Sequence, residues 1–345
     1  MTTLSFPIAD PDILRNLEST YNLVRVTPSG QEQLAYSLIL PKGWVMEEEL
    51  GEQNDAIGRL AKIGLFADKV GSDATVVQVF YSRIPFEIDV RDWAEYEAAK
   101  FGTKLVYIQD VVFACGPVVD AGGIYGPPSN EQVVRLVAHP DSARIFLVST
   151  MTPLSRYPDQ QKNIAIATNS FKLLMPSGST QLEQWLDTGG GDPAFHVGYP
   201  ASWLSRPVEK KVPGKSGVDL LLVRDEQLAA YVRVKATDPN VAGEISNQDA
   251  LKIAAEELRE GGVSLSSPWQ ENHDPSVLRV EGLIGAYVDS GQMAGKAVEL
   301  RFGLLKRGNL VFSATLISVQ KAENPILWMR SKRAYEIALA TARPG

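Results

Sequence analysis

Short apolar runs dominate the chain, and Gly, Pro and Asp separate them. The runs are rich in Val, Ile, Phe and Tyr, the residues that favour β-strands. Several runs follow one another through short turns, as in VRDEQLA and LKRGNL, so adjacent strands are expected to pair antiparallel. The predicted strands are YSLIL, ATVVQVFY, KLVYIQDVVFA, QVVRLVAH and ARIFLVST in the first half, and AFHVGYP, VDLLLVR, LAAYVRVKA, SVLRVEGLIGAYV, KAVELRFGLL and NLVFSATLIS in the second.

A helical spacing of apolar residues interrupts these strands twice in each half. A helix beginning at Asp92 and its counterpart at Asp249 place apolar residues at i, i+4 and i+7. Each Asp stands where an N-cap belongs, because its side-chain oxygen can accept from free backbone N–H groups. The predicted buried positions are Ala94, Ala98, Phe101, Leu251, Ala255 and Leu258 in these helices, and Ile164, Ala167, Thr168, Phe171, Ser331, Ala334, Tyr335 and Ala338 in the closing helices of the two halves.

The two halves repeat one another in order. PKGW at residues 41–44 corresponds to PASW at 200–203, and EIDVRDW corresponds to EISNQDA. Further along, VVDAGG corresponds to YVDSGQ, RIFLVST to NLVFSAT, and YP at 157–158 to NP at 324–325. An ordered repeat of this length indicates a duplicated domain rather than a short binding motif used twice.

The grouping of strands and helices predicts the fold class α+β, with two tandem α/β/α sandwich domains. Each domain is expected to be an antiparallel sheet flanked by helices, and 345 residues suit two domains of ordinary size. The linker prediction rests on MPSGSTQLEQWLDTGGGDP, in which LEQWL suggests a short amphipathic helix and GGGD a flexible tip. The predicted parts are an N-terminal extension over 1–30 with a short helix in DPDILRNLEST, a first domain over 31–175, a linker over 176–193 and a second domain over 194–345.

A strand that ends in P-x-x-W, an antiparallel sheet, a helix after the early strands and a closing helix resemble the PsbP-like and Mog-type superfamily of α/β/α sandwiches. LPKGW, residues 40–44, is most similar to the bacterial cytoplasmic branch that includes the Eag-type chaperones of type VI secretion effectors. The resemblance covers roughly residues 36–174 and 195–342, although the small chaperones carry one such domain per chain. It implies binding rather than catalysis, with an apolar helical segment of a protein client shielded in an apolar groove on a sheet face.

Composition and charge limit the partners. The chain has 34 Lys and Arg against 41 Asp and Glu, and nucleic-acid affinity comes largely from Lys and Arg that displace counterions, so no nucleic-acid partner is expected. The N-terminus lacks the basic start and apolar run of a secretory signal, and the longest apolar run, VVFACGPVV, is too short to cross a bilayer. We therefore predict a cytoplasmic protein without membrane insertion, and the oligomeric state stays open.

No motif of enzyme chemistry is present. The sequence has no G-x-S-x-G elbow, HExxH, Walker loop or dinucleotide fingerprint. His139, His196 and His273 are each solitary, so no histidine pair with helical spacing can bind zinc. His139, before Pro140, is expected in a turn, His196 in a strand and His273 in a loop. We predict that the protein is not an enzyme and has no cofactor or metal site.

Cys115 and an acidic run are the other candidates for chemistry. Cys115, in VVFACGP, could act as a nucleophile if a histidine approached it, but a Cys at the end of an apolar strand is expected to be a small buried hydrophobe. As the only cysteine, it can form no intrachain disulfide. Glu47, Glu48 and Glu49 could attract a cation or a basic partner, and a solvated face is the expected role of such a run.

Tryptophans are the best candidates for an interaction surface. Trp44 and Trp203 follow Pro at equivalent strand ends, and we expect them to close the two cores. Trp185, in the linker, and Trp269, in SSPWQENHD, have no counterpart in the other half, so these two are the predicted partner-binding residues. The sequence thus predicts a non-enzymatic protein-binding module, such as a chaperone or adaptor for a secreted effector. A small-molecule or lipid-binding protein is the alternative, ahead of an enzyme.

Overall fold

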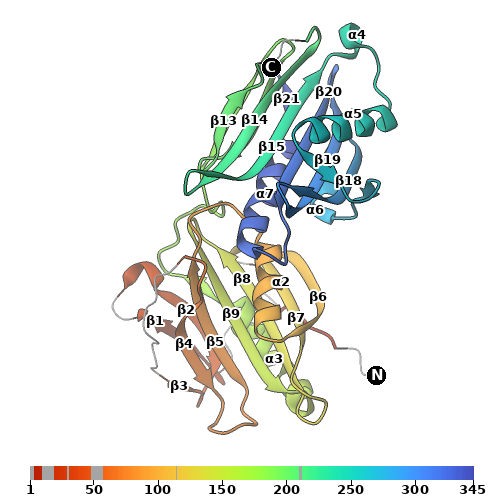
Figure 1. Cartoon of the computed structure of the whole chain (residues 1–345). Helices are drawn as coiled ribbons and strands as arrows, with labels where there is room; N and C mark the ends of the chain where they lie inside the picture. The colour runs from red at the N-terminus through yellow and green to blue at the C-terminus, as the bar shows by residue number, and fades with distance from the viewer. Residues whose placement is uncertain (1–3, 10–18, 29–30, 48–56, 114, 210–211) are drawn as a thin grey trace. The chain divides into compact units, whose positions relative to one another are not determined.

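The computed structural model describes residues 4–9, 19–28, 31–47, 57–113, 115–209 and 212–345. The chain divides into two compact units (Figure 1). The first unit comprises Met1–Pro85 and Val90–Leu182, and the second comprises Phe86–Asp89 and Glu183–Gly345. Residues 10–18, which hold most of the predicted N-terminal helix, lie outside the described residues.

The first unit is built on a seven-stranded sheet with the order β3-β4-β5-β9-β8-β7-β6, and its neighbouring strands pair antiparallel. A three-stranded sheet, β1-β2-β10, packs against it. The elements are β1 Tyr21–Val26, β2 Tyr36–Pro41, β3 Val45–Glu47, β4 Ala61–Ala67, β5 Val76–Arg83, α2 Val90–Lys100, β6 Lys104–Phe113, β7 Gly116–Tyr125, β8 Gln132–Pro140, β9 Arg144–Pro153, α3 Tyr157–Asn169 and β10 Lys172–Leu173, with 3-10 turns at Glu32–Leu34 and Leu154–Arg156.

The core of the first unit lies between its two sheets. Val77 of β5 and Phe146 of β9 are fully buried there, together with Tyr36 of β2. Ala167 of α3 and Phe171 close the same cluster. Burying each large apolar side chain stabilises the fold by about 1.5–3 kcal/mol, so this cluster holds the two sheets and α3 together.

Strand β6 forms one edge of the seven-stranded sheet. Its register with β7 shifts between Leu105 and Tyr107, which marks a β-bulge. Arg91 of α2 donates from Nη2 to the Ile108 carbonyl at 2.8 Å, so this edge carbonyl is occupied. Val112, near the end of the strand, is 80% exposed. The edge is therefore irregular and partly capped.

The second unit has an eight-stranded sheet with the order β13-β14-β15-β20-β19-β18-β16, in which β17 also pairs with β18. A three-stranded sheet, β11-β12-β21, completes it, and neighbouring strands again pair antiparallel. The elements are β11 Trp185–Gly191, β12 Ala194–Pro200, β13 Leu204–Pro207, β14 Lys215–Arg224, β15 Gln227–Thr237, α4 Pro239–Ala242, α5 Asn247–Glu260, β16 Val263–Leu265, β17 Gln270–Glu271, α6 Pro275–Leu278, β18 Leu283–Met293, β19 Lys296–Arg307, β20 Leu310–Val319, α7 Pro325–Thr341 and β21 Arg343–Pro344.

Strand β20 shows how the two faces of this larger sheet differ. Buried and half-buried residues alternate along it, as expected for a strand with two unlike faces. Phe312 and Leu316 lie on one face, in a cluster with Tyr335 of α7. Ile317 lies on the other face, in a cluster with Leu258 of α5. Helix α5 packs on β16 and β19, at one side of this second face of the sheet. The part of the face formed by β15 and β20 therefore lies beside the helix.

The two large sheets follow one order of elements. In each sheet the first three strands in chain order lie side by side, as β3-β4-β5 and β13-β14-β15. The last long strand in chain order, β9 or β20, is the other neighbour of the third. A helix, α2 or α5, lies between the third strand and the rest, and α3 or α7 follows the last strand. The structure is mostly antiparallel sheet with few helices, in keeping with the predicted α+β class.

The predicted linker differs from the structure in its second half. Trp185–Gly191 is strand β11, paired with β12, and not an amphipathic helix followed by a flexible tip. The glycines allow close packing, because a Cβ on Gly189 would lie 1.8 Å from the Phe195 carbonyl oxygen, and one on Gly190 2.4 Å from the Phe195 ring. The Gly run therefore allows close packing of β11 against Phe195 of β12 and is not a flexible connection.

Two further segment predictions are corrected. Tyr21–Val26, assigned to an N-terminal extension, is strand β1 and pairs with β2 inside the first unit. SVLRVEG is part of a long predicted strand, but Pro275–Leu278 is the short helix α6. Its N-cap, Asp274, accepts from the Ser276 N–H and precedes a Pro at the first helical position, a combination that starts a helix.

The residues predicted to cap α2 and α5, Asp92 and Asp249, each lie inside the first turn of the helix instead of before it. Asp92 lies buried in the first turn of α2, which begins at Val90. Ser246 caps α5, since its Oγ accepts from the Asp249 N–H at 3.1 Å and donates to the Asp249 carboxylate at 2.6 Å. Asp249 is therefore the third residue of the helix, at position N3, and not the cap.

The predicted buried faces of the helices are largely confirmed. Where they differ, Phe101 is 40% exposed because it lies beyond the end of α2, and Leu251 and Ala255 are half-buried because the apolar stripe of α5 runs through Ala250 and Ala254. The buried positions that agree are Ala94, Ala98, Leu258, Ile164, Ala167, Thr168, Phe171, Ser331, Ala334, Tyr335 and Ala338.

Candidate functional site

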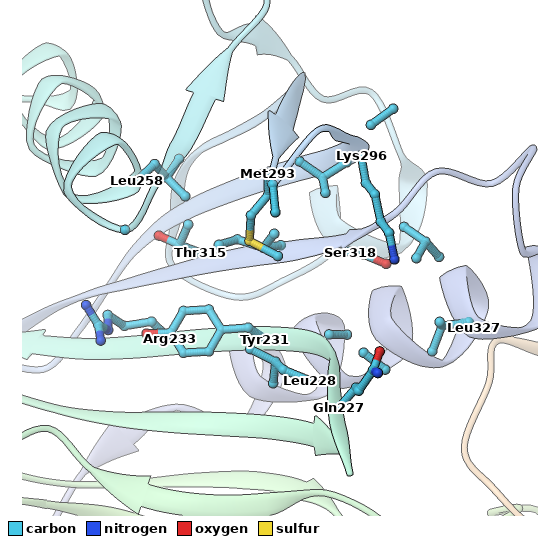
Figure 2. A pocket seen from close by; sticks show the side chains of 18 of the residues that line it. Gln227, Leu228, Tyr231, Arg233, Leu258, Met293, Lys296, Thr315, Ser318 and Leu327 are labelled. Carbon is cyan, nitrogen blue, oxygen red and sulfur yellow. The ribbon is translucent and has the colours of Figure 1, made fainter. Parts of the chain in front are cut away.

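A cavity of about 810 Å³ opens in the second unit, beside α5 (Figure 2). Its floor is the part of the sheet that α5 leaves uncovered, with Tyr231 of β15 and Thr315 and Ile317 of β20. Leu258 of α5 forms one wall, and Leu327 of α7 lies at the opposite end. The volume is in the range of pockets that hold ligands, about 300–1000 Å³.

Three side chains form a hydrogen-bonded group at the floor, and we call Asp219, Tyr231 and Arg233 the second-unit triad. Arg233 donates to Asp219 through Nε at 2.8 Å and through Nη2 at 3.1 Å, and the Tyr231 hydroxyl donates to the same carboxylate at 2.8 Å. The bonds to Asp219 raise the pKa of Arg233, so the guanidinium stays charged. Its Nη1 has no hydrogen-bond partner among the described residues, and Arg233 lines the cavity.

A second ion pair stands above this floor, where Lys235 of β15 binds Glu257 of α5. Burial lowers the pKa of Lys235, and the contact with Glu257 opposes that effect. The lining also includes apolar side chains, among them Leu228 of β15 and Met293 of β18. The ion pair fixes α5 to β15 and so holds the cavity wall in place.

Two tight hairpins form the rim of the cavity. Asp225 and Glu226 join β14 to β15 with φ of 48° and 62°, and Ala294 and Gly295 join β18 to β19 with φ of 50° and 77°. Positive φ at both central residues defines a type I′ turn, which suits the twist of the adjoining strands. Non-glycine residues pay about 1–2 kcal/mol for this conformation, so the first hairpin carries more strain than the second.

The lining determines what the cavity can do. The described residues around it offer apolar side chains, hydroxyls and charges of both signs, and include no His or Cys. Candidates for acid–base or nucleophilic chemistry in these walls are therefore carboxylates, hydroxyls and an amine, such as Glu257, Tyr231 and Lys296. The arrangement suits noncovalent binding of a group that is apolar along one side and presents a hydrogen-bond acceptor to Arg233.

The predicted partner-binding tryptophans lie outside the lining of this cavity. Trp185 is half-buried at the start of β11, with the Arg333 guanidinium 5.7 Å from its ring centre. Trp269 is half-buried against the cluster beneath α5, its ring centre 6.1 Å from that of Phe302. Both side chains pack within the second unit, and their role in partner binding stays a prediction.

The repeated tryptophans serve the cores to different degrees. Trp203 is 2% exposed inside the main cluster of the second unit, as predicted. Trp44 is half-buried and packs at the margin of the first-unit core. The similar motifs PKGW and PASW therefore lie at equivalent strand ends, after β2 and after β12. The tryptophan of the second motif lies deeper in its core than that of the first.

Cys115 and His139 meet in the first unit, contrary to the prediction for both. Cys115 is exposed rather than buried, and its Sγ lies 3.4 Å from His139 Nδ1. His139 lies in β8 and is buried, because it packs on the Phe171 ring rather than in a turn. Burial lowers the pKa of His139 to about 3, and desolvation of the thiol raises the pKa of Cys115. Both groups are thus neutral, the opposite of an activated thiolate–imidazolium pair.

The other candidate ligands are dispersed. His196 lies in strand β12 and His273 in a loop, as predicted, and both are exposed. Glu47 ends β3, while Glu48 and Glu49 lie outside the described residues. Within the described part of the chain no group of three His, Cys, Asp or Glu side chains could hold a metal ion. No helix in that part is long and apolar enough to cross a membrane.

Sequence reasoning missed the cavity, although one signal pointed toward it. In LAAYVRVKA, polar and apolar residues alternate, so Tyr231, Arg233 and Lys235 share one face. Val232 and Val234, on the other face, belong to the core. The alternation indicates a strand with a polar face, but the space above that face depends on where α5 lies.

Comparison with known proteins gave no match to a family model and none to a curated protein. Similar solved structures include LpqN, involved in cell envelope biogenesis of Mycobacterium tuberculosis, with 12% identity, a TM-score of 0.31 and coverage of 48% of this chain and 96% of LpqN. The cyanobacterial PsbP of Synechocystis sp. PCC 6803 has 11% identity, a TM-score of 0.33 and coverage of 46% and 95%. The type VI secretion immunity protein TplEi of Pseudomonas aeruginosa has 11% identity, a TM-score of 0.23 and coverage of 88% and 97%. These scores are too low to support an argument about function.

Proposed function

We propose that the protein is a non-enzymatic protein-binding module, and that the cavity of the second unit receives apolar side chains of a partner protein. One observation carries the proposal: about 810 Å³ of space lies on a sheet face that the unit's own helix leaves open. Apolar side chains from a partner would cover Ile317, Leu258 and Met293, and about 25 cal/mol is gained for each Å² of apolar surface removed from water.

The finer parts of the proposal rest on the sequence. We propose that the matching order of elements in the two large sheets arose by duplication of one domain, which the repeated motifs also favour. The resemblance to Eag-type chaperones supports a cytoplasmic chaperone or adaptor that shields a segment of a secreted effector. An open groove, rather than a closed chamber, is the feature such a role requires.

A small molecule or lipid is the second candidate for the cavity. Its volume is that of a ligand pocket, and Arg233 and Lys296 could pair with an acidic head group while the apolar lining holds a chain. Native mass spectrometry of the purified protein separates the two proposals. A bound small molecule of constant mass would favour the ligand, whereas the mass of the bare chain would favour the protein partner.

The direct test places a photo-crosslinking residue at Leu228, which is 50% exposed and lines the cavity. The matched control places it at Val70, which is 89% exposed in the first unit. We expect Leu228 to crosslink to one segment of one protein, and Thr315→Trp, which fills the cavity, to abolish that adduct. Equal adducts at both positions, or an adduct that Thr315→Trp leaves intact in a folded protein, would contradict the proposal.

A further inference from the structure

Leu4–Ala9 lies against the first unit as a segment without regular secondary structure. Leu4 and Phe6 pack against Tyr157 and Ile164 of α3 and Val133 of β8. We infer that this segment is the exchangeable occupant of a peptide-binding groove, and that a partner protein's segment with an aromatic residue before a proline binds there in its place. The groove belongs to the first unit, so this inference is independent of the cavity in the second.

The groove holds the segment by its main chain. The Tyr157 hydroxyl and the Gln161 side-chain amide each donate to the Ser5 carbonyl at 2.5 Å. Arg135 donates from Nη1 to the Pro7 carbonyl at 2.8 Å. Every residue has a carbonyl group, so these three bonds do not depend on the side chains of the segment. A different peptide in the same conformation can accept all of them.

One aromatic ring supplies the specificity. The Phe6 ring centre lies 4.8 Å from that of Tyr107 and 5.6 Å from that of Tyr157. Gly122 of β7 leaves the space for this arrangement, because a Cβ there would lie 2.7 Å from the Phe6 ring and 2.3 Å from the Tyr107 ring. Pro7 holds Phe6 in an extended backbone conformation. The groove therefore fits an aromatic residue followed by proline.

Part of the groove is held in place by hydrogen bonds that do not involve its occupant. Arg135 donates to Asp120 through Nε and Nη2, both at 2.9 Å, and the Tyr107 hydroxyl donates to Asp120 at 2.8 Å. We call Tyr107, Asp120 and Arg135 the first-unit triad. Asp120 thus fixes two of the side chains that meet the segment, Tyr107 and Arg135, through bonds that do not involve the segment. Preorganised groups of this kind bind an incoming segment with little loss of conformational freedom.

The segment is also accessible to exchange. Ser5 and Pro7 are exposed, and Ile8 is 56% exposed. Phe6, which makes the ring contacts, is half-buried. A competing segment can thus reach the groove from solvent, and the resident segment sets the affinity that a competitor must exceed.

The test uses the full-length protein and a labelled peptide of residues 2–9, TTLSFPIA, followed by fluorescence anisotropy. In the wild-type protein the resident segment competes with the peptide. Phe6→Ala removes the ring that holds the resident segment, so we expect this variant to bind the peptide at least about tenfold more tightly. Ile8→Ala is the matched control on the exposed side, and it should bind the peptide like the wild type.

A second variant tests the main-chain contacts. Tyr157→Phe in the Phe6→Ala background keeps the ring and removes the bond to the Ser5 carbonyl, and we expect peptide binding to weaken about threefold to tenfold. If Phe6→Ala does not fold by circular dichroism, Phe6→Leu supplies the same comparison with a smaller gain.

Three results would overturn the inference. The first is equal peptide binding by wild-type and Phe6→Ala proteins that are both folded. The second is binding that Tyr157→Phe leaves unchanged. The third is a concentration-dependent wild-type dimer in analytical ultracentrifugation that Phe6→Ala abolishes, because the occupant would then be a second copy of this chain and not a different protein.

Discussion

The first-unit triad and the second-unit triad use the same three residue types and the same hydrogen bonds, yet they differ in what covers them. In both, the Arg guanidinium donates two bonds to the Asp and the Tyr hydroxyl donates a third. The Arg135 side chain is 1% exposed beneath the N-terminal segment, whereas the Arg233 side chain is 31% exposed at the floor of a cavity.

This difference in cover decides whether the arginine stabilises the fold or is left to bind a ligand. A guanidinium that binds one carboxylate through Nε and Nη2 still has Nη1 as a hydrogen-bond donor. The surrounding residues determine which acceptor Nη1 meets. In the first unit the Pro7 carbonyl accepts from Nη1, so the group is satisfied within the chain. In the second unit Nη1 of Arg233 meets no acceptor among the described residues, so the same chemistry is left for a ligand.

The largest expected effect tests the burial of the two arginines. Arg135→Met leaves Asp120 buried with the Tyr107 hydroxyl as its remaining donor, and we expect the free energy of unfolding to fall by about 3–5 kcal/mol. Arg233→Met should cost only about 1–2 kcal/mol, because its site is partly solvated. Urea denaturation of each variant measures the difference, and similar losses would show that the triads are equally buried.

The second effect, which is smaller within any one pH unit, extends the contrast to the histidines. The pKa of His139 is lowered to about 3 by burial, whereas an unfolded histidine titrates near 6.5, so only the unfolded state binds the proton between these values. Stability should therefore fall as pH drops from about 6.5 toward about 3, by up to about 1.4 kcal/mol per pH unit. His139→Phe should remove this part of the slope, while the exposed His196→Phe should keep it. Unfolding free energies at several pH values measure the slope, and identical slopes for the two variants would refute the assignment.

The smallest expected effect concerns the strained rim of the cavity. Glu226 has φ of 62° in the hairpin between β14 and β15, and glycine adopts that conformation without strain. Glu226→Gly should raise the free energy of unfolding by about 0.5–1 kcal/mol. Glu226→Ala keeps the unfavourable φ and should change stability little. Thermal unfolding of both variants measures the gain, and a loss on Glu226→Gly would show that the Glu226 side chain itself holds the hairpin.

Much of the fold could be predicted because strands and helices leave local patterns. The alternation in NLVFSATLIS matches the alternating burial of β20, and most of the predicted strand runs fall within observed strands. The helical stripe of α7 was also found, since Ser331, Ala334 and Ala338 are all buried. Such patterns arise from the geometry of one element against its sheet and need no knowledge of distant contacts.

The remainder depends on contacts between segments that are distant in sequence. The glycines of β11 predict a flexible tip, but in the structure they leave room for Phe195, which a Cβ at Gly189 or Gly190 would clash with. The contact of Cys115 with His139 joins residues 24 positions apart, and the order β7-β8 sets it. The cavity depends on where α5 crosses its sheet, which the α5 sequence alone does not determine. The sequence therefore predicted most strands and helices but did not indicate the cavity.

The irregular edge strand β6 bears on how the protein behaves when it is crowded. A straight, unpaired edge is a template on which a second molecule can add a strand, and repeated addition leads to fibres. The bulge between Leu105 and Tyr107 breaks the regular spacing of donors and acceptors, and Arg91 occupies the Ile108 carbonyl within the same stretch. A second copy cannot extend a continuous ladder past these points. We expect the protein to remain dispersed at high concentration even though Val112 is exposed on that strand.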